Sequence, residues 1–478
     1  MSNSRHPIDT NSRPAGKETA RLLGIGLFCL GAIIYGSLIP FDFTPRFSLA
    51  EAWETFLKTP YFRIGAEGRA DWVANLLIYI PPAFFLCGAS GIHKPKGRSF
   101  LGFFIALSLC GMVAVGVEFT QLYFPPRTVS LNDLLAEFIG TLLGIFLWYL
   151  CGKRLYNYWQ SVYTGGPHAV KAAVILYVST YLIICLFPYD FIVSSAELRT
   201  KFDSDAVGIF LAGLGCDSSL RCVIKQLTEI LISMPLGILL AWLWGVDKPT
   251  TLRRVLFTGF IIGSGIELIQ LLEISGISQG ISVLNRILGM GLGCWLLQRL
   301  KKQPLRIAPV AVKFFLILLL PPYLLLLARL NGGFSQAWLS WGEARRQLAT
   351  LQWLPFYYHY FSTETNAMAS LVLIACSYAP LGLGLWLWRG RPGRAGYWLL
   401  PMLPAGGCAL LIEAGKLFLS LRPDPTNILI AACSASLVYS IAAWMQRWNQ
   451  TTTVPPGRSV TAKILRRSGY HEIPRRSG

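Results

Sequence analysis

Charged residues are scarce in this chain of 478 residues, and acidic ones are the scarcer kind. Only 14% of the residues are charged, with 24 acidic against 43 basic side chains, while 53% are hydrophobic. The mean hydropathy is +0.49. Because soluble domains usually carry about 25% charged residues, this composition excludes an ordinary soluble protein and predicts an integral membrane protein.

Residues that mark several enzyme classes are also few. The chain has five histidines, and no two of them form a ligand pair on one face of an expected helix, which argues against a zinc protease within the membrane. No glycine-rich phosphate loop is visible, so the sequence does not indicate a nucleotide-driven pump. We therefore expect neither a metal nor a cofactor, and the sequence leaves open whether the protein is an enzyme.

Most of the eleven cysteines fall in or beside apolar runs, where they act as small apolar residues. Cys216 and Cys222 are the exceptions, because they lie in the polar segment GCDSSLRC. In an oxidising compartment they could close a small disulfide loop; the alternative is two free thiols at the membrane surface. Their spacing, with no histidine nearby, is unsuited to zinc.

About twelve segments approach the roughly 20 apolar residues that a helix needs to cross a bilayer. They predict an all-α integral membrane protein, and no cleavage site follows the first run, so we expect that run to remain as a helix. The expected helices cover residues 22–39, 71–91, 99–121, 131–151, 171–188, 226–245, 255–272, 280–298, 308–328, 367–388, 397–419 and 426–446.

Basic residues gather in every second connection between these helices, for example at Lys94, Arg253 and Arg389, and in the tail after Arg447. Short cytoplasmic loops are rich in Lys and Arg, so both termini are expected in the cytoplasm. The net charge of +19 then marks the cytoplasmic surface, where it attracts anionic lipid. Binding of nucleic acid would need the charge on one soluble face, so we expect membrane lipid and no nucleic acid as a partner.

Three parts of the chain resemble one another. The sequence reads GVEFTQL around Glu118, GIELIQL around Glu267 and LIEAGKL around Glu413, with the glutamates 149 and 146 residues apart. Similarity at a near-constant period predicts internal repeats, here three tandem units of four helices. The predicted boundaries are a cytoplasmic segment 1–21, repeats at 22–161, 162–306 and 307–449, and a basic, disordered cytoplasmic tail 450–478.

The first repeat concentrates polar side chains at the expected outer ends of its helices. Asp71 and Asn75 share one helix face because they are four residues apart. An ionisable group in lipid costs about 2.5–3.5 kcal/mol on insertion scales, which favours a function for Glu118. Arg127 can pair with this carboxylate or join it in gripping a polar head group. The candidate ligand-binding residues here are Arg69, Asp71, Asn75, Glu118, Gln121, Arg127 and Asp133.

The other two repeats keep part of this pattern. Lys416 follows Glu413 by three residues and can neutralise it. Glu137 of the first repeat and Arg286 of the second occupy equivalent depths, which suggests a buried ion pair between the repeats. The candidate residues in these two repeats are Glu267, Gln270, Glu413, Arg422 and Asn427.

Each repeat also has an aromatic segment outside the membrane. Ser48 and Glu51 form a capping-box pattern that predicts a short helix over 49–57. Such segments either lie on the outer membrane surface or pack on the helix ends. The equivalent starting motifs are PFDF at 40–43, PYDF at 188–191 and, more loosely, PFYY at 355–358.

The order of polar residues in the first repeat resembles the VanZ-like family of bacterial membrane proteins. The resemblance is carried by Arg69-x-Asp71-x-x-x-Asn75, by Glu118-x-x-Gln121, by Arg127, and by Asp133 before Gly140-x-x-x-Gly144. The resemblance covers about residues 22–151 well and the later repeats in part. One position departs from the family pattern, because the family usually has asparagine where this chain has Glu137. The resemblance implies a multipass protein of the bacterial cytoplasmic membrane. The family is named for a member linked to low-level teicoplanin resistance, and other members look associated with surface polysaccharide production.

Three functions are compatible with these features. The first is action at the outer leaflet on an envelope amphiphile, in connection with a lipid-linked glycan, a surface polysaccharide or the response to a glycopeptide antibiotic. The second is a secondary transporter, although an odd number of four-helix units with charges near one face is unusual for that class. The third is a non-catalytic scaffold for polysaccharide assembly.

Overall fold

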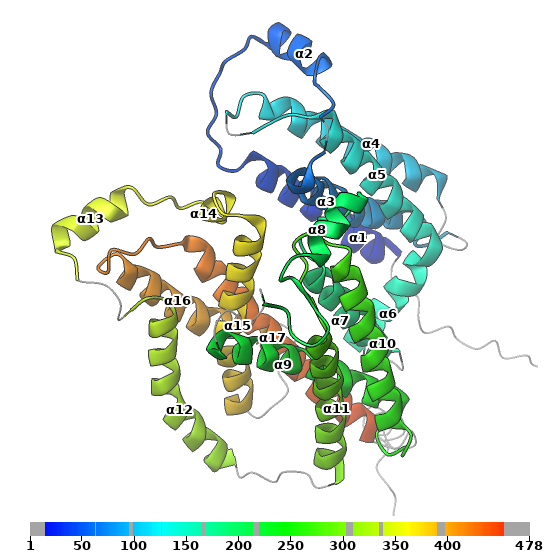
Figure 1. Ribbon diagram of the computed structural model, residues 1–478, viewed down its shortest axis with the longest axis vertical. Helices are drawn as coiled ribbons and strands as arrows, with labels where there is room; N and C mark the ends of the chain where they lie inside the picture. Colours follow the sequence, from blue (N-terminus) through cyan, green and yellow to red (C-terminus); the bar gives the residue numbers. More distant parts are fainter. Residues whose placement is uncertain are drawn as a thin grey trace, which may run out of the picture. The chain divides into compact units, whose positions relative to one another are not determined.

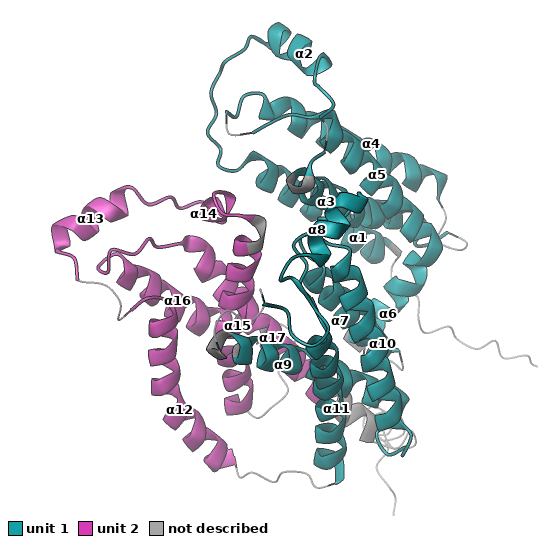
Figure 2. Cartoon of the chain, in the orientation of Figure 1, with its two compact units in different colours: residues 1–305 teal, residues 306–478 magenta. Residues whose placement is uncertain are grey.

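The computed structural model describes residues 15–62, 64–94, 99–125, 127–164, 168–213, 219–302, 309–333, 338–389 and 397–453. Nearly all of the secondary structure in these ranges is helical (Figure 1). The chain divides into two compact units, residues 1–305 and 306–478 (Figure 2). The first unit holds the first two predicted repeats, and the second unit holds the third.

The first predicted repeat is built around the proline-containing helix α3, which packs against α1, α4 and α5. Its buried core includes Tyr79, Leu86 and Trp148. The helices are α1 (Ala15–Leu38), α2 (Leu49–Leu57), α3 (Ala66–Gly91), α4 (Phe100–Gln121) and α5 (Leu131–Leu147), and a π-helical turn at Trp148–Gly152 leads into α6 (Lys153–Thr164).

The second predicted repeat completes the first unit. Two-residue strands, β1 (Val207–Gly208) and β2 (Ser278–Gln279), pair in parallel and tie the outer segment to the start of α11. This pairing is a small departure from the predicted all-α fold. The helices are α7 (Ala169–Cys185), α8 (Ser195–Phe202), α9 (Ser219–Trp244), α10 (Thr251–Leu271) and α11 (Gly280–Lys302).

The second unit has its own core, which includes Leu327, Tyr378 and Ala409. A 3-10 turn at Tyr397–Leu399 precedes its α16. The helices are α12 (Pro309–Leu330), α13 (Trp341–Ala349), α14 (Tyr357–Tyr360), α15 (Glu364–Arg389), α16 (Met402–Lys416) and α17 (Pro425–Thr453).

Ten helices in the described ranges are long and apolar enough to cross a membrane. All twelve predicted segments are helical, but α7 has 17 residues and α16 has 15, which is short of the roughly 20 that span a bilayer. The fold is therefore that of a multipass, mostly helical membrane protein. The count of twelve spans stays a prediction.

Glycine allows the closest helix contacts. A Cβ atom at Gly140 or Gly144 of α5 would overlap backbone carbonyl oxygens of α3, and one at Gly289 or Gly293 of α11 would overlap those of α9. Small residues at this spacing let helix backbones touch. The structure thus gives these two pairs the packing role that their spacing suggests.

The predicted short helix over 49–57 is α2. Ser48 Oγ accepts a hydrogen bond from the Glu51 N–H at 3.4 Å, and the Glu51 carboxylate accepts one from the Ser48 N–H at 2.8 Å, which completes the predicted capping box. Helix α13 begins with the same capping box, formed by Ser340 and Glu343. Helix α8 has the N-cap bond alone, in which Ser194 accepts from the Glu197 N–H.

One equivalence drawn from the sequence is wrong. The PFDF and PYDF motifs at 40–43 and 188–191 precede the short helices α2 and α8, whereas PFYY at 355–358 follows α13. All three motifs place an aromatic residue at positive φ, namely Phe41, Tyr189 and Phe356. The same turn thus occurs at different positions relative to the flanking helices. A proline followed by an aromatic residue does not specify it alone, because Tyr61 and Tyr323 also follow prolines and have no positive φ.

Candidate functional site

Three predicted site residues of the first repeat meet where α3 approaches the start of α5. Asn75 Nδ2 donates to Asp133 Oδ1 at 3.0 Å. The Asp133 carboxylate also accepts from Ser130 Oγ at 2.6 Å, and Ser130 caps α5. These two bonds fix the orientation of the carboxylate, and Asp71 lies one helical turn before Asn75 on the same face of α3.

Asn132 belongs to this region, although no pattern in the sequence selected it. Its side chain accepts from the Phe62 N–H at 2.8 Å and donates to the Phe62 carbonyl at 3.0 Å. The two bonds hold the extended segment before α3 against the start of α5. An asparagine in the first turn of a helix carries no signal of a partner 70 residues away, so only the fold reveals the contact.

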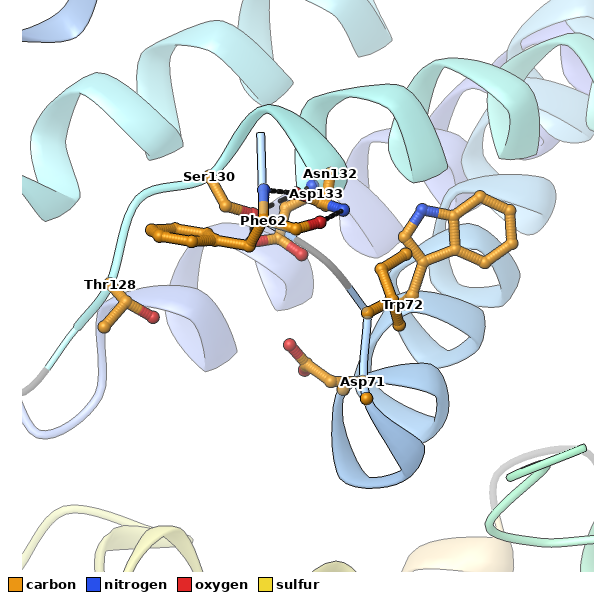
Figure 3. Close-up of a pocket in the computed structure, with 10 residues that line it drawn as sticks. Phe62, Asp71, Trp72, Thr128, Ser130, Asn132 and Asp133 are labelled. Carbon is orange, nitrogen blue, oxygen red and sulfur yellow. Dashed lines mark hydrogen bonds between the residues drawn. The ribbon is translucent and has the colours of Figure 1, made fainter. Parts of the chain in front are cut away.

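A pocket of about 520 Å³ opens between α3 and the start of α5. Figure 3 shows the Asp71 carboxylate pointing into the space that Phe62, Ser130 and Asp133 border on the opposite side. Trp72 and Thr128 also line it. Among the described residues around this pocket, two are acidic and none is basic.

Glu118 is not among the described residues that line the pocket, and it is only 3% exposed. The backbone of Ser130, which lines the pocket, provides a hydrogen bond to its carboxyl group, and the negative charges of Glu137, Asp133 and Asp71 act on it. Its Oε2 atom has no hydrogen-bond partner within the described part of the chain, and the same is true of Glu137 Oε2. Two buried carboxyl groups thus lie close together with unsatisfied oxygen atoms.

Gln121 and Arg127 contact the end of α1. Gln121 Nε2 donates to the Ser37 carbonyl at 3.0 Å. Arg127 Nε donates to the Ile39 carbonyl at 3.0 Å, and its Nη2 to those of Gly36 and Ile39 at 2.8 and 2.7 Å. The last carbonyls of a helix lack partners within it, so these contacts of both predicted site residues are structural.

Arg69, a further candidate residue of the first repeat, has its partners in the second predicted repeat. Its guanidinium binds both oxygens of Glu197 in α8, at 3.0 and 2.6 Å, and donates to the Phe191 carbonyl at 2.7 Å. The Arg69 hydrogen bond, together with the Val193 N–H, lowers the pKa of Glu197 to about 2. Arg69 therefore joins the first predicted repeat to the outer segment of the second.

In the second predicted repeat, the equivalent glutamate has its own cation. Arg286 forms a buried ion pair with Glu267 and donates through Nε to Tyr181 at 3.0 Å. The suggested Glu137–Arg286 pair between repeats is thus wrong, because a carboxylate on the adjacent helix α10 already takes the guanidinium. Gln270 does repeat the role of Gln121, since its Nε2 donates to the Cys185 carbonyl at the end of α7 at 2.8 Å.

The third predicted repeat neutralises its glutamate in the way its sequence suggests. Lys416 Nζ lies 2.8 Å from Glu413 Oε1. Asn427 Nδ2 donates to the same oxygen at 2.8 Å, so this predicted residue is part of the cluster. Arg422 is not in that ion pair but lies over the Tyr358 ring, 5.3 Å from its centroid.

The three glutamates share one backbone environment. Glu267 accepts from the Gln279 N–H at 2.6 Å and Glu413 from the Asp424 N–H at 2.8 Å, as Glu118 does from the backbone of Ser130. In each case the donor lies eleven or twelve residues after the glutamate. The three positions therefore differ mainly in electrostatics.

A second buried polar cluster lies in the outer segment of the second predicted repeat. Lys201 is 4% exposed and donates to the carbonyls of Ile274 and Gly276. Glu273 is 1% exposed, and burial, followed by the charge of Asp190, raises its pKa to about 8. The Lys201 contacts resemble those of Arg127, because a basic side chain again satisfies backbone carbonyls.

Two further predictions concern metals and disulfides. No group of three His, Cys, Asp or Glu side chains in the described ranges is arranged to hold a metal ion. Cys222 lies in α9, but Cys216 lies outside the described residues. Cys222 is disulfide-bonded, and its pairing with Cys216 stays a prediction.

The helices and the polar cluster together define a multipass membrane protein with a polar site at the ends of α3, α4 and α5. Residues 6–152 match the VanZ/LLP1 family model, which confirms the resemblance found in the sequence. This part of the chain is a VanZ-like domain, and it contains all seven candidate residues of the first predicted repeat. Neither the curated proteins nor the solved structures compared with the chain include a match.

Proposed function

We propose that this VanZ-like protein acts at the outer leaflet of the bacterial cytoplasmic membrane, where it binds the head group of a cell-envelope amphiphile. The amphiphile would be a lipid-linked glycan, a precursor of a surface polysaccharide or a target of the glycopeptide response. The positive-inside pattern of the loops supports this orientation, with both termini in the cytoplasm. The pocket beside Asp71 and Asp133 would then face outward.

The observation that carries this proposal is the position of the pocket beside an oriented carboxylate. Asn75 and Ser130 hold Asp133 in place, and this pre-organisation lowers the cost of binding a polar head group. On another face of α5, apolar side chains are exposed in the chain alone, including Leu131 (43%), Leu135 (44%) and Phe138 (48%). These side chains would contact the acyl or polyprenyl chain of the same ligand.

We further propose that the three four-helix segments are tandem repeats and that only the first keeps a binding site. The shared backbone bonds to Glu118, Glu267 and Glu413 support a common origin of the segments. The ion pairs of Glu267 with Arg286 and of Glu413 with Lys416 give those two glutamates a structural role. An unpaired buried carboxylate is costly, so its retention at Glu118 favours a function.

The test uses a deletion strain complemented with the full chain or its variants, with abundance measured by immunoblot. Asp71→Asn and Asp133→Asn should accumulate normally but lose complementation of envelope lipid composition and of resistance to amphiphilic antibiotics. Asp42→Asn, which changes an exposed carboxylate of the same domain, serves as the matched control. Full complementation by both pocket variants would refute the proposed site.

Variants in all three segments, including changes at Glu118, Glu267 and Glu413, separate the two alternative functions. A scaffold predicts that activity is lost only in proportion to abundance, for changes in any of the three segments. A secondary transporter predicts counter-flow of a labelled solute in proteoliposomes that depends equally on Glu118, Glu267 and Glu413.

A further inference from the structure

We infer that a loop of the second four-helix segment inserts apolar side chains into the membrane at the N-terminal end of α11, and that its partner is the acyl region of the lipid bilayer. The loop, residues 206–213, follows α8 and is called the apolar loop below. This surface is separate from the pocket of the first segment, so the inference does not depend on the proposed function. It starts from three neighbouring side chains that a loop in water would leave uncovered.

The apolar loop exposes three consecutive large apolar side chains. Ile209 is 100% exposed, Phe210 57% and Leu211 48%. Single exposed apolar residues are ordinary on a protein surface, whereas a contiguous apolar patch marks contact with a protein or a membrane. These residues belong to an uncharged stretch, residues 206–215. An apolar stretch of about 10–14 residues is too short to cross a bilayer and is typical of buried or interfacial segments, and the exposure of Ile209 favours the interface.

The backbone of the apolar loop is held in place although its side chains are exposed. Strand β1 lies in the loop and pairs with β2, which leads directly into α11. The Ile281 N–H donates to the Phe210 carbonyl at 3.0 Å, and the Ala212 N–H donates to Gln279 Oε1 at 3.3 Å. These contacts fix the loop on the first turn of α11. A loop that is already ordered loses little conformational entropy when its side chains become buried.

The apolar loop lies on the side of α11 that carries its exposed leucines. A Cβ atom at Gly280 would overlap the Ile209 carbonyl oxygen, so the loop backbone covers the side to which Gly280 points. Leu284 and Leu288 share that side because the three positions are four residues apart, and they are 46% and 55% exposed. Helix α11 is long and apolar enough to cross a membrane. The exposed leucines therefore face acyl chains, and the loop sits where that face begins.

Lipid is the partner that fits this position. The apolar surface of the loop continues the lipid-facing side of α11, whereas the side that includes Asn285, Gly289 and Gly293 is buried, and both of these glycines contact α9. Apolar and aromatic side chains are favoured at the membrane interface. The nearest charged residues before the loop, Asp203 and Asp205, are acidic and exposed, so attraction to anionic head groups does not account for the contact. Burial of apolar surface does.

The experiment places the photo-crosslinker p-benzoylphenylalanine at Ile209, Phe210 or Leu211 in the full chain, reconstituted in phosphatidylcholine nanodiscs. After irradiation, mass spectrometry should detect adducts with lipid acyl chains at all three positions. The matched control carries the crosslinker at Asp205, an exposed position of the same segment, and should give no acyl-chain adduct. Because all four side chains are exposed, the labelled proteins should keep the thermal midpoint of the wild type.

The lipid composition tests the kind of contact. Salt screens interactions between exposed charges but not the burial of apolar surface. The adduct yield should therefore stay the same when phosphatidylglycerol replaces phosphatidylcholine and when the salt concentration is raised. A yield that requires phosphatidylglycerol and falls with salt would show an electrostatic contact with head groups and would overturn the inference.

The crosslinker also reports any other occupant of this surface. A crosslink to another part of the same chain would show that the protein covers the loop itself, and a crosslinked dimer would show that a second copy does. The absence of adducts at all three positions would place the loop in water. Each of these three results overturns the inference.

Phe210→Asp gives an independent measure that needs no crosslinker. A charge at the edge of the hydrocarbon region is unfavourable, so the variant should have a lower thermal midpoint than the wild type in nanodiscs. Phe210→Leu keeps the position apolar and should match the wild type. Exposed positions in water tolerate such a change with little effect on stability, so an unchanged midpoint for Phe210→Asp would contradict insertion of the loop.

Discussion

Three glutamates with similar backbone contacts differ in their side-chain partners. Glu267 is paired with Arg286 and Glu413 with Lys416, whereas no basic side chain among the described residues pairs with Glu118. In each ion pair the basic residue comes from the next turn of the same helix or from a neighbouring helix. The electrostatic role of a residue therefore depends on a few surrounding positions more than on its own identity.

The first prediction contrasts two of these glutamates. Glu267→Gln leaves Arg286, which is 4% exposed, without its carboxylate, and breaking a buried pair in this way costs about 3–5 kcal/mol. The thermal midpoint of the detergent-solubilised protein should fall clearly. Glu118→Gln removes a buried charge without leaving a cation unpaired, so its midpoint should stay the same or rise. Equal losses in the two variants would contradict this account.

At the scale of secondary structure elements, short helices outside the membrane are held by polar contacts. Helix α8 binds α3 through Glu197 and Arg69, and a capping box starts α2. Both helices have few buried residues. Polar contacts, which respond to pH, should therefore control their stability.

The second prediction concerns the link between α8 and α3. The pKa of Glu197 is about 2 in the folded protein against an ordinary value of 4.5, so the ionised form is favoured by folding. Its contribution to stability is complete above about pH 4.5 and is lost as the pH falls toward 2. The difference in thermal midpoint between the wild type and Glu197→Gln should therefore shrink below pH 4.5. Glu54→Gln, at an exposed pair with Lys58, should differ little from the wild type throughout.

The third prediction concerns the outward face of α2. Leu49, Trp53 and Leu57 are 72%, 52% and 67% exposed and share one helix face because they are four residues apart. An apolar stripe of this kind should lie in the membrane interface. Oxygen should accelerate the relaxation of spin labels at these three positions. A water-soluble nickel chelate should accelerate the relaxation of a label at Glu54. The reverse pattern would show that α2 instead packs in an aqueous loop.

At the scale of the whole molecule, the sequence predicts twelve crossings and the structure contains ten helices of sufficient length in its described ranges. Helix α7, with 17 residues, spans about 26 Å, which is slightly less than the roughly 30 Å hydrocarbon core. Local thinning of the bilayer can accommodate such a short helix. The segment between α7 and α9 therefore lies on one side of the membrane if α7 crosses and on the other side if it does not.

The fourth prediction is the resulting topology. Cysteines introduced at Asp42 and Val193 should react with a membrane-impermeant thiol reagent in intact cells, while one at Asp247 should react only after the membrane is opened. Val193 is 73% exposed, so a lack of labelling there would not reflect burial. A cytoplasmic position for residue 193 would show that α7 does not cross and would refute the twelve-helix topology.

The sequence by itself determined the helices, the capping box of α2, the VanZ-like order of residues and the Glu413–Lys416 pair. These features depend on composition, on residues close in the chain or on a repeated pattern, so local physics specifies them. It also selected Asn75 and Asp133, which the fold brings together.

Only the tertiary structure decided the partners of the arginines. Arg69 binds Glu197, 128 residues away, Arg127 binds the end of α1, and Arg286 binds Glu267 rather than Glu137. The reason is that long basic side chains reach any acceptor within several ångströms, and helix packing alone places those acceptors. The lack of a basic partner for Glu118 among the described residues became visible in the same way, because it depends on what surrounds the side chain in space.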